Sequence, residues 1–217
     1  MAALDLHEQE QFEALKARWK DNRKQILGAL LIGVVVVGGW RGWQYYQSKQ
    51  GGDAANLYAE FTRQLDSNDA KRIEAAAAAL TDKFASTAYA SRAALLAAQA
   101  HERVRDIASA KTQLQWVIAH ASEASLKDVA RLRLASLLLD EKNYADALTL
   151  LEAEHTASFD GLYADLKGDV LSAQGKVDAA RSAYQVAIDK TDAKSMYRNL
   201  IQMKLDALTL EQGVAAK

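Results

Sequence analysis

Histidine is the side chain of this sequence best suited to binding a metal or moving a proton near neutral pH, and the chain has four of them. They stand at His7, His101, His120 and His155. No two are four residues apart, which is the spacing that places both zinc ligands of an HExxH site on one helical face. Cysteine is absent, which excludes thiolate zinc sites, disulfides and cysteine nucleophiles and leaves the redox compartment undecided. The sequence therefore predicts no metal site and no cofactor.

Three further features have residue types used in catalysis, but their contexts argue against it. A Gly-Lys pair begins at Gly175, yet it lacks the spacing of a phosphate-binding loop and no strand precedes it, so a turn explains it better. The carboxylate pairs Asp140-Glu141 and Glu152/Glu154 fall on expected solvent faces of helices. Spacing supports no Ser-His-Asp arrangement. We expect no catalytic residues and a protein that is not an enzyme.

The charge of the chain argues against nucleic-acid binding. The formal net charge is −1, and from Gln50 onward there are 20 Lys and Arg against 23 Asp and Glu. A nucleic-acid-binding face concentrates basic residues, and no such cluster appears in that part of the sequence. Nucleic acid is therefore excluded as a partner.

The elements that carry these residues are predicted to be helices throughout. Proline, which is not tolerated inside helices, does not occur among the 217 residues. Alanine, the strongest helix former, is abundant, notably from Ala75 to Ala79. The composition indicates an all-α chain with short connections.

An apolar segment near the N-terminus is long enough to cross a membrane. The uncharged run from Ile26 to Trp40 would cover only about 22 Å as a helix, but its extension to Tyr46 reaches about 31 Å, close to the hydrocarbon thickness of a bilayer. Aromatic residues gather at its end, as they do at membrane interfaces: Trp40, Trp43, Tyr45 and Tyr46. We interpret residues 25–46 as a transmembrane signal-anchor helix in the lipid bilayer.

Two alternatives to a membrane anchor remain for this segment. A cleaved signal peptide also has a basic region followed by apolar residues, but it needs small residues at the cleavage site, where this chain has the bulky GGWRGWQYY. A buried helix of a globular core would not explain four consecutive valines between a charged flank and an aromatic one. Both alternatives are disfavoured.

The charged flanks of the segment predict its orientation. Five basic residues precede it and only Arg41 and Lys49 follow closely, which places the N-terminus in the cytoplasm. The five are Lys16, Arg18, Lys20, Arg23 and Lys24. Residues 1–24 then form a cytoplasmic amphipathic segment, through Leu4, His7, Phe12, Leu15 and Trp19, which either lies on the membrane surface or continues into the span. Residues 47–217 form a domain outside the cytoplasm, which in a Gram-negative cell is the periplasm.

This outer domain contains a repeat of two helices, here called helix A and helix B. The stretches ARLRLASLLLDEKNYADALTLLE and ADLKGDVLSAQGKVDAARSAYQVA align with a constant offset of 33 residues. Each has a small residue in helix A (Ala135, Gly168), a short turn, and a small residue in helix B (Ala147, Ala180), which lets the two helices pack closely. This order resembles the tetratricopeptide repeat, without its terminal proline.

Weaker units flank the two aligned repeats. A looser unit is built around Ala98 and the turn at Arg105, and its offset of 37 predicts about four extra residues in the connection from Ala121 to Lys127. A degenerate first pair covers 54–65 and 70–84, separated by Ser67-Asn68-Asp69. A capping helix covers 195–208, with an apolar stripe expected to close the end of the stack: Met196, Leu200, Met203 and Leu208.

With these motifs together, the chain resembles the YfgM family of bacterial inner-membrane proteins, ancillary subunits of the Sec translocon. The resemblance rests on EALKARWKDNRK and GGWRGWQYY around the anchor, on ADLKGD, AQGK and ARSAYQVA in the last repeat, and on the terminal QMKLDALTL. It implies a periplasmic, tetratricopeptide-like domain beside the SecYEG translocon, partnered with a membrane-anchored periplasmic prolyl isomerase of chaperone type.

The function expected from this resemblance is that of a non-catalytic adaptor that binds a chaperone or translocating polypeptides in its helical groove. The alternative is a scaffold for another complex of the cell envelope. No partner-binding residue transfers from the family to this sequence. We expect the helix A faces of the last two repeats to line the groove.

Overall fold

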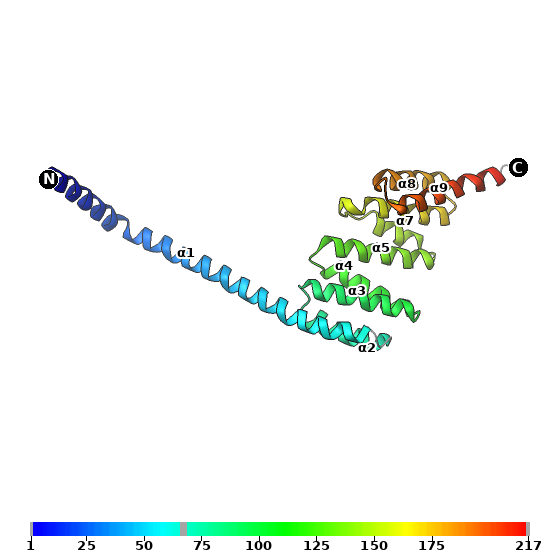
Figure 1. Ribbon diagram of the computed structural model, residues 1–217, viewed down its shortest axis with the longest axis horizontal. Helices are drawn as coiled ribbons and strands as arrows, with labels where there is room; N and C mark the ends of the chain where they lie inside the picture. The colour runs from blue at the N-terminus through cyan, green and yellow to red at the C-terminus, as the bar shows by residue number, and fades with distance from the viewer. Residues whose placement is uncertain (1, 66–68, 216–217) are drawn as a thin grey trace. The chain divides into compact units, whose positions relative to one another are not determined.

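The computed structural model describes residues 2–65 and 69–215, and these form helices without a β-strand (Figure 1). The prediction of an all-α chain is therefore confirmed. The chain divides into two units, Met1–Gln50 and Gly51–Lys217. The helices are α1 (Ala2–Gln64), α2 (Ala70–Lys83), α3 (Ala88–Arg103), α4 (Ile107–His120), α5 (Ala124–Asp140), α6 (Tyr144–Leu151), a short 3₁₀ turn η2 (Ala157–Phe159), α7 (Asp160–Ala173), α8 (Val177–Lys190) and α9 (Met196–Ala215).

The first helix is continuous where the sequence suggested separate elements. The sequence leaves open whether residues 1–24 lie on the membrane surface or continue into the span, and it suggests a new helix near Ala54, but α1 runs unbroken for 63 residues. No proline interrupts it, and the pair Gly51-Gly52 costs only about 1 kcal/mol per glycine. The side chains of Leu4, His7, Phe12 and Leu15 lie outside the described part. The functional division into residues 1–24, 25–46 and 47–217 stays a prediction.

Three helix pairs follow with the same turn, and they confirm the predicted repeat. Helix A is α3, α5 or α7, and helix B is α4, α6 or α8. The first turn residue is left-handed in every pair, with φ of 62° at Arg105, 60° at Lys142 and 72° at Gly175. The next backbone N–H bonds back to helix A each time, as from Asn143 to the Leu138 carbonyl at 2.8 Å. This shared geometry makes the three turns equivalent.

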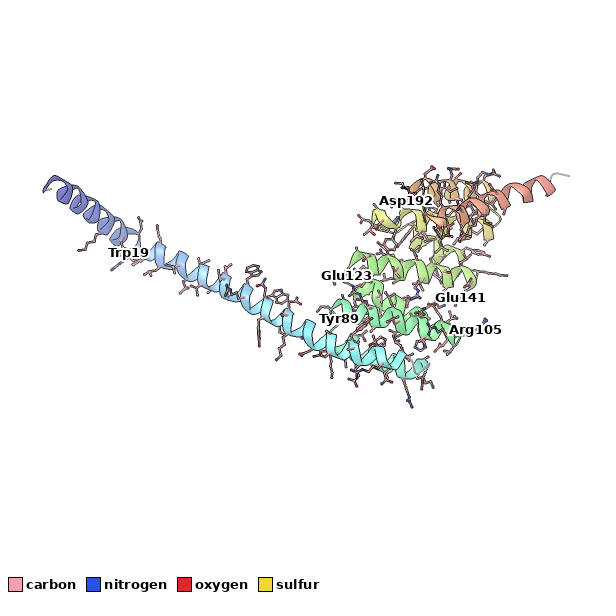
Figure 2. The ribbon with its side chains drawn as sticks, in the orientation of Figure 1. Trp19, Tyr89, Arg105, Glu123, Glu141 and Asp192 are labelled. Atoms are coloured by element: carbon pink, nitrogen blue, oxygen red, sulfur yellow. The ribbon has the colours of Figure 1, made fainter. Side chains whose placement is uncertain are left out.

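Figure 2 shows how these turns are arranged within the helical unit. Arg105 and Glu141, from two turns between helix A and helix B, lie at one end of the stacked helices. Tyr89, Glu123 and Asp192 lie near connections from one pair to the next, at the opposite end. Each pair therefore runs across the stack and back.

The predicted insertion between 121 and 127 is wrong. Helix α4 ends at His120 and α5 begins at Ala124, so the connection is short. The longer offset comes instead from the helices themselves: α4 and α5 have 14 and 17 residues, against 8 in α6 and 14 in α7. Ala124, Leu126 and Lys127 are good helix formers and no glycine separates them, so the extra residues extend the helix.

Small buried residues bring the helices together, as the repeat pattern predicts. Ala98, Ala135, Ala147 and Ala180 are each fully buried. Gly168 lies under the ring of Tyr184, with no room for a Cβ atom. Partly buried Trp116 packs against both the first and the middle apolar clusters, so the core is continuous between them.

The last helix, α9, caps the stack, but with a different face from the one expected. Ile201 and Leu208 are buried against α7 and α8, whereas Met196, Leu200 and Met203 are 87 %, 46 % and 69 % exposed. The prediction that these three close the apolar end is wrong; only Leu208 does so. The rotation of α9 has a physical cause: its Tyr197 and Lys204 side chains reach the buried Asp165.

Candidate binding surface

The buried carboxylate of Asp128 on α5 is satisfied by groups from the following repeat. Its Oδ2 accepts hydrogen bonds from Thr156, at 3.0 Å from the backbone N and 2.7 Å from Oγ1, and its Oδ1 accepts one from Tyr163 at 3.3 Å. Arg131 pairs with it at 3.1 Å. Burial alone would raise the pKa of Asp128, but the Thr156 bonds and the Arg131 charge outweigh it and hold the pKa below its usual value. This cluster ties α5 to α7.

A second polar cluster ties α7 to α9. Lys204 donates to Asp165 at 2.9 and 3.0 Å and to Asp169 at 2.8 Å, Tyr197 donates to Asp165, and Tyr184 donates to Asp169 at 2.7 Å. Burial alone would lower the pKa of Lys204, but its bonds to the two carboxylates raise it. Burial and the adjacent carboxylates also raise the pKa values of Tyr184 and Tyr197. Paired in this way, the charges hold the cap in place.

The three described histidines make structural contacts in separate places. Buried His101 has Nδ1 at 3.2 Å from Asp106 and Nε2 at 3.4 Å from Glu74, so it lies between α2 and the α3–α4 turn. His120 stacks on Trp116, with ring centroids 4.6 Å apart. His155 stacks on Tyr163 at 3.9 Å. Each ring thus packs between local elements rather than joining another histidine.

Ion pairs and hydrogen bonds at the surface connect consecutive repeats. Arg92 on α3 donates to Glu123 before α5 at 3.1 Å, and Lys111 on α4 donates to Glu141 after α5 at 2.7 Å. Arg133 on α5 donates to the Leu95 carbonyl of α3 at 3.1 Å. Such exposed pairs add little stability individually. Together, these three contacts between the same two repeats nevertheless fix the spacing of their helices.

Two grooves result between neighbouring B helices. The first groove has a volume of 430 Å³ and lies between α4 and α6, lined by leucines and by polar residues such as Lys111, Gln115 and Thr149. The second groove, of 270 Å³, lies between α6 and α8 and is lined by residues including Leu151, Tyr163 and Val186. Mixed apolar and polar linings of this size suit the side chains of a bound polypeptide.

Helix A residues of the last two repeats, the surface expected from the sequence, take part in both grooves: Leu134 and Leu138 on α5 line the first, and Tyr163, Ala164 and Lys167 on α7 line the second. The helix A faces of the last two repeats present exposed Ser136 and Asp140 on α5 and Leu162 on α7. Whether those faces bind a partner stays a prediction. Periodicity did not indicate the width of the grooves or their helix B residues, because both depend on how far apart two consecutive repeats lie.

The segment expected to cross a membrane lies in the first unit. In the described part of the chain, one helix is long and apolar enough for this role. Its apolar side chains are largely exposed, from 55 % at Val37 to 68 % at Leu31, and the Trp43 and Tyr46 rings lie 6.4 Å apart. Such a surface requires an apolar environment.

Comparison with known proteins agrees with this architecture. Residues 16–210 match the family model described as a tetratricopeptide repeat-like domain. A protein of Neisseria gonorrhoeae named ancillary SecYEG translocon subunit is 30 % identical over 95 % of this chain and 99 % of its own length. Proteins of the same name from Escherichia coli and Haemophilus influenzae are 29 % and 28 % identical, over 98 % and 100 % of their lengths.

Proposed function

This chain belongs to the family of ancillary SecYEG translocon subunits with a tetratricopeptide repeat-like domain, and from that premise we propose that it is a non-catalytic adaptor beside the Sec translocon. One observation carries the proposal most directly. The buried carboxylates of the helical domain are held by side chains from other elements: Asp128 by Thr156 and by Tyr163 of α7, and Asp165 by Lys204 of α9. These buried carboxylates hold the helices in place and so fix the shape of the grooved surface. A rigid grooved surface supports binding of another polypeptide as the function of the domain.

The proposed location is the bacterial inner membrane. Residues 25–46 of α1 cross the bilayer, since their exposed apolar side chains need lipid around them. The excess of basic residues before this segment supports a cytoplasmic N-terminus and a periplasmic helical domain. The anchor raises the local concentration of the domain beside the channel.

The proposed partners are the SecYEG translocon, a membrane-anchored periplasmic prolyl isomerase-type chaperone, and translocating polypeptides. The names of the relatives support the first, and family resemblance supports the second. The grooves support binding of extended or helical segments, because the helices that line them are already packed around buried apolar clusters, with the Lys111–Glu141 ion pair beside the first groove. A preformed groove loses less entropy on binding than a flexible one.

Photocrosslinking in intact membranes tests this proposal. A photoreactive residue replaces Thr149 in the first groove or Ser136 on the exposed face of α5, which is a helix A. The control replaces Gln185, which is exposed on α8 and absent from the linings of both grooves. We expect adducts with a translocon subunit or a periplasmic chaperone from the first two variants, and few from the control. Adducts with components of another envelope complex, and none with the translocon, would instead identify a scaffold for that complex.

The orientation has its own test, which the absence of cysteine makes simple. A single cysteine replaces Val104, which is 52 % exposed in the helical domain, or Lys24 before the anchor. A membrane-impermeant maleimide applied to the periplasmic side should label Val104→Cys and leave Lys24→Cys unlabelled until the membrane is opened. The reverse pattern would rule out the proposed location.

A further inference from the structure

The outer face of α9 is apolar, which is unusual for the helix that ends a stack of repeats. Such helices normally present a polar outer face to water. Here the exposed outer side carries Met196, Leu200, Met203 and Ala207, while Ile201 and Leu208 of the same helix already fill the core. The helix therefore has two apolar faces, and the inner one is occupied. We call the outer one the α9 seam.

The spacing of the α9 seam indicates the kind of surface that covers it. Its residues are separated by four, three and four positions, which is the heptad pattern of a helix that packs along another helix. In the sequence, Leu210 and Val214 continue the same spacing. A flat lipid surface or an extended peptide has no need of a repeat of 3.5 residues. The pattern favours a helical occupant.

We propose that this occupant is α9 of a second copy of the chain, packed antiparallel. The order of spacings reads the same in both directions, so a two-fold axis between Ile201 and Gln202 sets each Leu200 against Met203 of the other copy and each Met196 against the small Ala207. A large residue opposite a small one fills space without a clash. The seam is thus complementary to itself.

Charges beside the seam favour the antiparallel arrangement. A parallel pair would place Asp206 next to Glu211 of the second copy, and like charges at these flanking positions repel. An antiparallel pair places Asp206 next to the neutral Asn199 instead. Asp206 also accepts a hydrogen bond from Gln202 of its own helix at 2.8 Å. This bond holds the carboxylate at the edge of the seam, so that it does not reach over the apolar residues.

The size of the seam determines where the pair forms. The stretch from Met196 to Ala207 covers about three helical turns, and one such contact buries less than the roughly 1,200 Å² of a stable interface between free proteins. Association of copies held in one membrane is stronger, because confinement raises their effective concentration. The pair is therefore expected in membranes rather than in dilute detergent.

Cysteine crosslinking in membranes containing the full chain tests the proposal, since the natural chain has no cysteine. Around the proposed axis, residue 203 is offset along the helix from its symmetry mate by about 4.5 Å and residue 196 by about 16 Å. A short bismaleimide should therefore join Leu200→Cys and Met203→Cys copies into a product of twice the 23.7 kDa chain mass, and leave Met196→Cys unjoined. The control is Val104→Cys, 52 % exposed after α3, outside the linings of both grooves and similar in exposure to Leu200.

A second variant separates association from chance collision. Leu200→Cys combined with Met203→Lys places a charge in the seam, and the dimer product should fall to the level of Val104→Cys while circular dichroism shows an unchanged helical content. Undiminished crosslinking of this variant would overturn the proposal. Equal crosslinking at 196, 200 and 203 would show a parallel pair, and adducts with a different protein in place of the dimer would show another occupant; either result overturns it.

Discussion

Tyr184 on α8 covers Gly168 on α7 so closely that a Cβ atom on the glycine would lie 2.5 Å from Tyr184 Cδ1 and nearer still to Cε1. The tyrosine cannot easily move away. Its hydroxyl donates to Asp169 at 2.7 Å, and Lys204 Nζ lies 5.7 Å from its ring centroid. A glycine inside a helix costs about 1 kcal/mol relative to alanine, so the close contact between α7 and α8 outweighs that cost.

Gly168→Ala is expected to destabilise the protein by about 1–3 kcal/mol, although alanine is the better helix former, because the new methyl group overlaps the Tyr184 ring. Urea unfolding of the full chain in detergent, followed by circular dichroism, measures the change. Gly161→Ala is the comparison and should cost less, since its nearest obstacle is the Thr191 hydroxyl at 2.6 Å, whose displacement breaks one hydrogen bond to the Ala187 carbonyl but moves no ring. Equal stability of the Gly168 variant and the natural chain would contradict the packing described.

Lys142→Gly is expected to stabilise the protein by up to about 1 kcal/mol, and Gly175→Ala to destabilise it by about 1–2 kcal/mol. Both residues occupy the left-handed region at equivalent turns, with φ of 60° and 72°, and only glycine adopts this conformation without steric cost. Thermal unfolding of the two variants checks the opposite signs. Lys142→Ala is the control, because it removes the lysine side chain but keeps the Cβ atom that makes this backbone conformation unfavourable. It should therefore not stabilise the protein.

Asp128→Asn is expected to lower the free energy of unfolding at neutral pH by about 1–3 kcal/mol, because Thr156, Tyr163 and Arg131 lose a charged acceptor. The pKa of Asp128 is depressed below 3.8 in the folded chain, so its stabilisation is present above that value and disappears as the pH falls through the folded pKa. The difference between variant and natural chain should therefore shrink in acid. Asp140→Asn, an exposed change on the same helix, should show no such trend.

High pH is expected to loosen the attachment of α9. The pKa values of Tyr184, Tyr197 and Lys204 are raised in the folded chain, so their stabilisation is complete below the ordinary tyrosine value of 10.0 and is lost as the pH rises past it. The melting temperature should drop on crossing pH 10. Tyr197→Phe removes one of these groups, and its alkaline drop should be smaller; an identical drop would contradict the role given to this cluster.

Much of the helical domain was predictable, because its determinants are local. The small residues and turns of the last two repeats fix which positions meet, and the structure places Ala135, Ala147 and Gly168 at those contacts. The continuity of α1 was not predictable in the same way. Weak helix formers such as Gly51 and Gly52 look like a boundary, but breaking a helix there needs a competing structure, which the sequence does not supply.

The orientation of α9 and the position of the grooves depend on distant residues. Two apolar stripes run along α9, and periodicity cannot tell which one faces the core. The choice is made by Asp165, which lies 39 residues before Lys204 and binds it. The grooves likewise depend on contacts between repeats, such as Lys111 with Glu141, 30 residues apart. Pairings at such separations are not visible in local patterns.

The bond between Asp165 and Lys204 also sets an order of events during synthesis. A ribosome adds Asp165 well before Lys204, so during synthesis the Asp165 carboxylate on α7 is for a time without its ion-pair partner. Because α9 brings both the cover and the partners of Asp165, the last helix is expected to dock only when the chain is nearly finished. A premature stop upstream of Lys204 would consequently leave the apolar end of the final repeat uncovered, not merely shorten the protein.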